Sequence, residues 1–232
     1  MIELKNVYLG YNKEYYALFD ISLKIENGER IALVGEQGSG KTAFLRLIAG
    51  LDKQQKGEIY IDNTPVQKVD FAHDVSLGYL SSKAIFFENR TVYKNLAWAL
   101  KIRGVDKKLW EKQIMQVLTD FGITQLKEAR VGTLCRSDRR LVQIARLALR
   151  PLDILLCDDI EMNTDSKTFG KLNEAIKKLI DKDKKDKIVI ITCNSAKGCK
   201  DLVDRRVKIV SGSLETEEVK KEETKKEEVK KD

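Results

Sequence analysis

The sequence predicts an α/β fold built on a mostly parallel β-sheet, with helices covering both faces of the sheet. In the last third of the 232-residue chain, short apolar runs alternate with an amphipathic helical segment, the order that crossovers between parallel strands produce. A glycine-rich segment follows the apolar run 30–34 and precedes a segment of helical composition. The chain contains only 2 prolines and 14 glycines, which excludes fibrous and proline-rich classes of protein.

The first quarter of the chain predicts short strands. Residues 2–9 and 18–25 alternate apolar and polar side chains, as strands with one buried face do. The Asn27-Gly28 pair is a turn signal before the next strand. The strands expected here are 2–9, 18–25, 30–34, 58–61 and 76–80.

The middle of the chain changes to apolar residues at helical spacing. Helices are expected at 91–103, 106–121 and 137–150, and Pro151 ends the third of them. These segments predict a helical subdomain of about residues 86–150. The side chains expected to face its core are Leu96, Leu100, Ile114, Val117 and Leu118.

The last third returns to alternating elements, which complete the parallel sheet. A strand is expected at 153–157, a helix at 172–180 and a buried strand at 187–192, with 206–210 as a closing edge strand. From Ser213 onward a charged unit repeats every five residues, a period that matches neither a helix nor a strand. We therefore expect one domain over residues 1–212 and a solvated, charged, low-complexity tail over 213–232, with an interaction tail as the alternative.

The charge balance points to an acidic partner. The formal net charge is +7, and residues 1–212 carry 37 Lys and Arg against 28 Asp and Glu. Such a surface suits nucleic acid, a phosphorylated ligand or an anionic membrane, without choosing among them. The basic residues Arg136, Arg139 and Arg140 are expected on a solvated helix face; the alternative is that one of them supplies positive charge to a phosphate.

The cysteines and the apolar runs indicate a reduced, cytoplasmic protein. Four cysteines lie at positions 135, 157, 193 and 199 without C-x-x-C spacing, which argues against a disulfide scaffold and a zinc ribbon. No stretch approaches the ~18 apolar residues that a membrane-spanning helix needs. At a membrane, we expect this chain only as a peripheral subunit.

One segment matches the phosphate-binding pattern G-x-x-x-x-G-K-[ST], and it lies between the expected strand 30–34 and a helix. Glycines let the backbone curl so that N–H groups face one point, where the helix N-terminus adds its positive dipole end. The lysine brings a charge to the β- and γ-phosphates, and the threonine offers a hydroxyl to Mg²⁺. The residues of this loop are Gly35, Glu36, Gln37, Gly38, Ser39, Gly40, Lys41 and Thr42.

A metal partner for Thr42 is expected at the end of a second buried strand. Asp158 directly follows the apolar residues 154–157 and would bind Mg²⁺ through water. Asp159 would then lie beside the water that attacks the γ-phosphate.

Together these motifs resemble the nucleotide-binding subunit of an ATP-binding cassette (ABC) transporter, over residues 2 to about 212. Tyr11 lies 24 residues before Gly35, where that family stacks an aromatic ring on adenine. Residues 47–52 and 56–62 are similar to the family's sequence after the phosphate loop, and 91–104 is similar to sugar and polyamine importer subunits. The resemblance implies the ABC ATPase fold: a P-loop NTPase core with an antiparallel lobe and a helical subdomain.

The resemblance also implies cofactors, partners and a location. It implies ATP and Mg²⁺, a transmembrane permease subunit, and a second cassette in a homo- or heterodimer, with no nucleic acid. The subunit would lie on the cytoplasmic face of the cell membrane. The apolar run of residues 84–87 falls where the family receives a short helix of the permease, so we expect an exposed aromatic ring at Phe86 or Phe87; ordinary core is the alternative.

The sequence departs from the family at catalytic positions. Ser82 stands where a glutamine is usual, Asp159 where a glutamate is usual, and Cys193 where a histidine is usual. The Leu-Ser-Gly-Gly-Gln signature aligns with residues 134–138, of which only Leu134 matches.

These departures separate binding from hydrolysis. Asp159 is one methylene shorter than Glu, and a general base must first reach its water. Cys193 lacks the two nitrogens of an imidazole. We expect ATP binding with slow or impaired hydrolysis that energises transport; the alternative is a non-hydrolysing, ATP-dependent switch or assembly subunit. A cassette acting on DNA or the ribosome is disfavoured, because the chain has a single cassette and no coiled-coil insertion.

Overall fold

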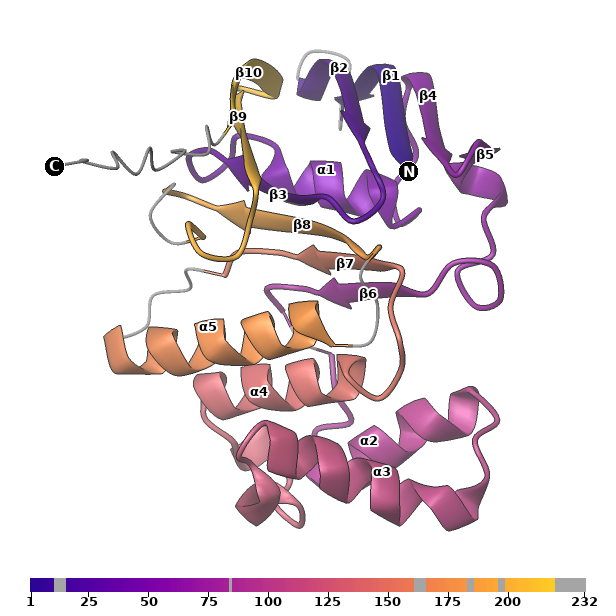
Figure 1. The fold of residues 1–232 in the computed structure, drawn as a ribbon, viewed down its shortest axis with the longest axis vertical. Coiled ribbons are helices and arrows are strands. Elements are labelled where there is room, and N and C mark those ends of the chain that lie inside the picture. Colours follow the sequence, from indigo (N-terminus) through magenta and orange to yellow (C-terminus); the bar gives the residue numbers. More distant parts are fainter. Residues whose placement is uncertain (11–15, 84, 161–165, 183–185, 196–198, 220–232) are drawn as a thin grey trace, which may run out of the picture.

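The computed structural model describes residues 1–10, 16–83, 85–160, 166–182, 186–195 and 199–219 (Figure 1). A six-stranded sheet runs through its centre in the order β10-β9-β3-β8-β7-β6. All neighbours in this sheet are parallel except β10, which is antiparallel to β9. Its strands are β3 (Arg30–Val34), β6 (Leu77–Leu80), β7 (Ile154–Cys157), β8 (Ile188–Cys193), β9 (Arg205–Val210) and β10 (Ser213–Val219).

A second, antiparallel sheet forms the lobe that the resemblance implied, in the order β2-β1-β4-β5. Figure 1 shows helix α1 (Lys41–Ile48) between this lobe and the central sheet. The apolar side chains of α1 join the two sheets in one hydrophobic cluster. The strands of the lobe are β1 (Ile2–Gly10), β2 (Tyr16–Ile25), β4 (Lys56–Ile61) and β5 (Thr64–Pro65).

On the opposite face of the central sheet lie α4 (Arg136–Leu147) and α5 (Ser166–Asp181), and α2 (Val92–Ile102) and α3 (Lys107–Asp120) pack beyond α4. Strand β8 is apolar along its whole length because both of its faces are buried. Ile188 and Ile190 face the α1 side, while Val189 and Ile191 face the helices on the other side. One face therefore has its helical cover, and the other is covered by α1 together with the antiparallel lobe.

The helical subdomain follows the expected pattern closely. Thr91 and Asp106 cap α2 and α3, each accepting a hydrogen bond from a backbone N–H of the first turn. The five side chains expected in the core of this subdomain are all buried: Leu96, Leu100, Ile114, Val117 and Leu118. No helix within the described ranges is long and apolar enough to cross a membrane.

Two helices have other bounds than the sequence predicted. Helix α5 begins at Ser166, six residues before the expected start, and α4 ends at Leu147, ahead of Pro151. Cations complete the end of α4, because Lys182 donates to the Ala148 carbonyl and Arg103 to the Leu149 carbonyl, each over 2.8 Å. Basic side chains at a helix C-terminus interact favourably with its dipole and satisfy its last carbonyls.

The expected edge of the sheet and the expected start of the tail were both wrong. Residues 205–210 are not at the edge, because Ser213–Val219 adds strand β10 beyond them. Ser211 and Gly212 both have positive φ, 47° and 83°, as the two-residue turn of a tight β-hairpin requires. The charged residues of this segment gave no strand signal in the sequence. The strand forms because the turn brings it to β9, and its pairing does not depend on an apolar face.

The hairpin yields a prediction about stability. A chain ending after Val219 should unfold within about 0.5 kcal/mol of the full chain, because it keeps every described strand. A chain ending after Gly212 should lose about 2 kcal/mol or more, because β9 becomes an unpaired edge. Urea unfolding followed by circular dichroism measures both. Equal transition midpoints for the two truncations would contradict the structural role of β10.

Candidate functional site

A loop of residues 35–40 connects β3 to α1 at the carboxyl end of the central sheet. The Gly35 N–H donates to the Cys193 carbonyl of β8 over 3.2 Å, which ties the start of the loop to the neighbouring strand. The Ser39 N–H donates back to the Glu36 carbonyl over 3.2 Å, which closes the loop into a turn. The expected strand, loop and helix are therefore present in that order.

Two glycines give the loop its shape for different reasons. Gly38 and Gly40 have φ of 85° and 105°, in the region that glycine adopts without strain. A side chain at Gly38 would point into open space, whereas a Cβ at Gly40 would lie 2.5 Å from the Ala17 carbonyl oxygen. Within the described residues, the N–H groups of both glycines make no backbone hydrogen bond, so these donors are available to an anion.

Helix α1 begins at this loop without a side-chain cap. Its N-cap residue is Gly40, and its first turn contains no acidic residue. The positive end of the helix dipole is therefore left for a ligand. Lys41 is 9% exposed, and its Nζ donates to the carbonyls of Gly35 and Glu36 over 2.6 and 2.7 Å. The ammonium group thus lies inside the curve of the loop.

Asp158 meets the start of α1 from the end of β7. Its carboxylate accepts hydrogen bonds from the Thr42 hydroxyl, over 3.0 and 3.2 Å, and from the Thr192 hydroxyl, over 3.1 Å. The Tyr79 hydroxyl lies 3.5 Å away, and burial, followed by the charge of Asp158, raises the pKa of this phenol well above its usual range. Hydroxyl and carboxylate oxygens side by side are ligands that suit Mg²⁺.

Asp159 follows with an unusual backbone. Its φ is 48°, in the left-handed region, and its N–H donates to the Thr192 hydroxyl over 2.8 Å. Thr192 therefore orients two consecutive acidic residues at once. The Asp159 side chain is half-buried, and its carboxylate makes no hydrogen bond to another described side chain.

The other sequence-predicted residues are placed differently. Cys193 is fully buried, and its Sγ lies 2.8 Å from the buried Sγ of Cys199 in the hydrophobic cluster beside the helices. Its backbone carbonyl accepts from the Gly35 N–H, whereas its thiol lies in the core. Ser82 is exposed beyond the end of β6. Tyr11 lies outside the described residues.

Sequence reasoning missed two residues of this site, Tyr79 and Thr192, and it misplaced Arg140, which lies behind the site and bonds the Asp158 carbonyl. Tyr79 and Thr192 lie at the ends of strands, and a hydroxyl one residue before Cys193 was the available signal. Arg140 was expected on a solvated helix face, and this was wrong, because it is only 4% exposed. Arg139 is also bound: it forms a two-bond ion pair with Glu88 over 2.6 and 2.7 Å.

The signature segment lies at the start of α4, near the surface. Cys135 and Arg136 are exposed, and the Cys135 Sγ lies 3.1 Å from the Ser137 hydroxyl. Cys135 stands at the N-cap of α4 without a side-chain cap bond. The first turn of this helix can therefore face a second molecule.

An apolar patch lies partly in the loop between Ser82 and α2 and partly on α2 itself. We name it the 85–98 patch, and its residues are Ile85, Phe87 and Trp98, which are 82%, 44% and 38% exposed. The rings of Phe87 and Trp98 meet edge to face at 5.5 Å. The expectation of an exposed aromatic ring at position 86 or 87 is thereby confirmed.

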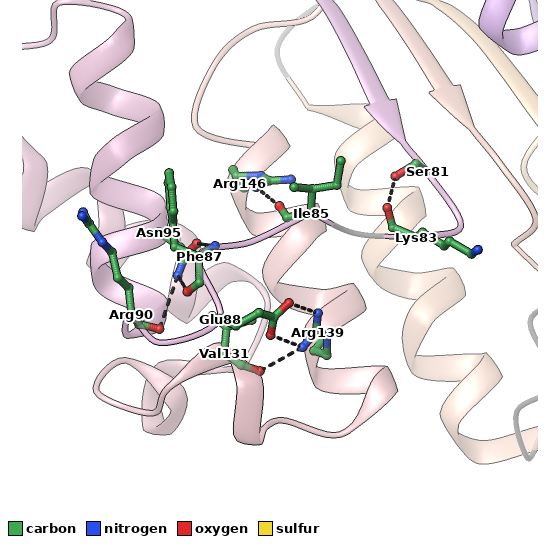
Figure 2. Close-up of polar contacts among 10 residues, drawn as sticks. All are labelled: Ser81, Lys83, Ile85, Phe87, Glu88, Arg90, Asn95, Val131, Arg139 and Arg146. Atoms are coloured by element: carbon green, nitrogen blue, oxygen red, sulfur yellow. Dashed lines mark hydrogen bonds and ion pairs between the residues drawn. The ribbon is translucent and has the colours of Figure 1, made fainter.

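The patch is held by side chains of two helices (Figure 2). The Asn95 side chain of α2 accepts from the Phe87 N–H over 2.9 Å and donates to the Phe87 carbonyl over 3.2 Å. Arg146 of α4 donates to the Ile85 carbonyl over 2.8 Å. An exposed apolar surface on a firmly held loop is typical of an interaction site.

Comparisons with known proteins agree with this geometry. The family model described as ABC transporter matches residues 18–161. The chain is 32% identical to the methionine import ATP-binding protein MetN of Clostridioides difficile, over 77% of this chain and 58% of MetN. It is 29% identical to the multiple sugar-binding transport ATP-binding protein MsmK of Streptococcus mutans, over 77% of this chain and 47% of MsmK. The chain thus spans about half the length of these curated relatives.

A solved structure is similar over nearly its whole length. The dimeric ATP-binding cassette MJ0796, in a post-hydrolysis state bound to ADP and Pi, superposes with a TM-score of 0.82. Its sequence is 26% identical, and the match covers 94% of this chain and 98% of that one.

The two glycines of the loop give a matched prediction. Gly38→Ala should destabilise the protein by about 1 kcal/mol, because only its positive φ opposes a side chain. Gly40→Ala should be worse by at least about 2 kcal/mol, because its Cβ also meets a backbone carbonyl that cannot rotate away. Thermal and urea unfolding of both variants test this order. Equal losses would mean that the loop does not approach Ala17 as closely as described.

Proposed function

Since the chain belongs to the ABC transporter family, we propose that it is an ATP-binding subunit of an ABC importer, which binds Mg-ATP at residues 35–42 and works with a membrane partner. One observation carries this proposal. The uncapped start of α1, the enclosed Lys41 ammonium and the Thr42–Asp158 pair converge at one end of the sheet.

The residues present fit a nucleotide triphosphate and its metal. The free N–H groups of Gly38 and Gly40 would bind phosphate oxygens, and Lys41 would exchange carbonyl contacts for phosphate contacts. The buried Ser39 hydroxyl has no hydrogen-bond partner among the described residues, so it adds an unused donor to the loop. Thr42 and Asp158 would hold Mg²⁺, which supplies charge neutralisation for the phosphates.

Hydrolysis in the isolated chain is proposed to be slow. The Cys193 thiol lies against Cys199 in the core, so it is not directed at the phosphate region. Asp159 carries a shorter side chain than the glutamate usual in the family, and Ser82 is exposed without a bond to Asp158 among the described contacts. The same placement of Cys193 favours the second candidate, an ATP-dependent switch or assembly subunit without turnover.

The proposed membrane partner is a permease segment with an apolar face. The 85–98 patch supplies an apolar surface, and cations border it, with Arg90 5.0 Å above the Phe87 ring and Lys101 5.4 Å above the Trp98 ring. Such a surface suits an amphipathic helix flanked by acidic residues. With this partner, the subunit would lie on the cytoplasmic face of the membrane and pair with a second cassette through the exposed start of α4.

The first test concerns nucleotide binding. Lys41→Ala removes a charge-assisted contact, so its affinity for Mg-ATP should fall by at least about 100-fold relative to the wild type. Isothermal titration calorimetry measures this loss, and Lys53→Ala, an exposed lysine after α1, should bind like the wild type. Similar affinities for Lys41→Ala and the wild type would overturn the proposed function.

The second test concerns turnover. The purified chain should hydrolyse ATP at least ~100-fold more slowly than the ~10 s⁻¹ of a typical enzyme. Asp159→Glu should raise this rate only slightly, because Cys193 and the signature segment are unchanged. Phosphate release measures the rates, and Lys41→Ala identifies any contaminating ATPase. A wild-type rate of several per second that Lys41→Ala abolishes would exclude slow hydrolysis.

A further inference from the structure

Arg140 occupies an unusual place for an arginine. It lies one turn into α4, yet only 4% of it is exposed, and its side chain points between the ends of β6 and β7. One guanidinium nitrogen, Nη2, donates to the Asp158 carbonyl over 2.9 Å. The other, Nη1, donates to the Ser81 carbonyl and to the Gln143 side chain. A single side chain thus bonds two backbone segments that are far apart in the sequence.

This cation is buried without an ion pair. No carboxylate within the described residues is in ion-pair contact with the Arg140 guanidinium. Burial lowers the pKa of Arg140 below its usual range, while the nearby charges of Asp158 and Asp159 act in the opposite direction. Removing a cation from water is unfavourable unless its donors are well satisfied. The hydrogen bonds to the Ser81 and Asp158 carbonyls satisfy donors of the Arg140 guanidinium.

Each of the two bonded segments belongs to a separate functional region. The Asp158 end is joined to the phosphate loop, because Thr42 and Thr192 both donate to the Asp158 carboxylate. Metal binding at Thr42 and Asp158 would open the bond between them, because both oxygens would turn to the metal. Because the Arg140 guanidinium donates to the Asp158 carbonyl, a displacement of Asp158 would move one of the acceptors of Arg140.

The Ser81 end begins the loop that carries the 85–98 patch. The Ser81 hydroxyl accepts from Gln143 over 3.3 Å and donates to the Lys83 carbonyl over 2.8 Å, the latter drawn in Figure 2. Further along, Arg146 holds the Ile85 carbonyl and Arg139 holds Glu88, as Figure 2 also shows. Polar side chains of α4 therefore hold this loop at several successive points.

We propose that Arg140 is a positioning residue that couples the metal-binding end of the nucleotide site to the loop carrying the partner patch. The inference rests on the proposed function for the identity of the nucleotide and the partner. Arg140 touches neither ligand; it acts by holding the Asp158 and Ser81 carbonyls together on α4. The planar guanidinium can donate in two fixed directions at once, whereas a lysine ammonium is a compact point charge.

Hydrogen exchange of the full chain tests this coupling, read at peptides covering residues 81–88. In the wild type, Mg-ATP should slow exchange in this segment by about threefold or more, and ATP with a metal chelator should not. Arg140→Lys should still bind Mg-ATP within about threefold of the wild-type affinity, because it leaves the phosphate loop intact, but its response should fall below about 1.5-fold.

A matched variant and the wild type keep the test decisive. Arg130→Lys changes an exposed arginine of the same subdomain and should respond like the wild type. A full response in Arg140→Lys would overturn the proposal. The proposal would also be overturned if Mg-ATP binds to the wild type by calorimetry but leaves hydrogen exchange of residues 81–88 unchanged. That measurement does not depend on the folding of any variant. Absence of binding by the wild type would instead overturn the proposed function, and the coupling with it.

Discussion

The hydrogen bonds between Thr42 and Asp158 join the first turn of α1 to the end of β7, and the site depends on this junction. The junction is possible because β3, β8 and β7 are parallel and in register, so that their carboxyl ends meet at one edge. Val34 pairs with Cys193 in this arrangement, and Thr192 comes within reach of Asp158. Sheet register, more than any single side chain, places a hydroxyl, a carboxylate and an open helix end together.

Helix α4 connects that edge to the surface of the helical subdomain. Its apolar residues face the sheet, as in any covering helix, but Arg139, Arg140 and Arg146 all bind the segment between β6 and α2. Backbone carbonyls of this segment accept from Arg140 and Arg146, and such bonds do not depend on which residue supplies the carbonyl. A loop of variable sequence can therefore be held in one position by one helix.

Binding and hydrolysis place different demands on the same edge. Phosphate binding needs N–H groups, a helix end and one ammonium, and all of these depend on backbone shape and on Lys41. Hydrolysis also needs side chains of the right length aimed at one water. The Cys193 thiol lies in the core and Asp159 has a shorter side chain than glutamate, whereas the loop and Lys41 have the shape and charge that binding would use. This contrast underlies the proposal of slow turnover.

The sequence by itself determined the loop of residues 35–40, the strand before it and the place of Asp158 at a strand end, because local spacing encodes them: glycines set the turn, and an apolar run ends in a carboxylate. It also determined the buried side chains of the helical subdomain, such as Leu96 and Leu100, through their helical period. Only the tertiary structure decided the rest. Strand β10 exists because a two-residue turn pairs it with β9, and the Cys193 thiol lies in the core because it is on the face of β8 that the helices cover. Arg140 is buried because its two acceptors come from segments that only the folded sheet brings together, and no local pattern carries that information.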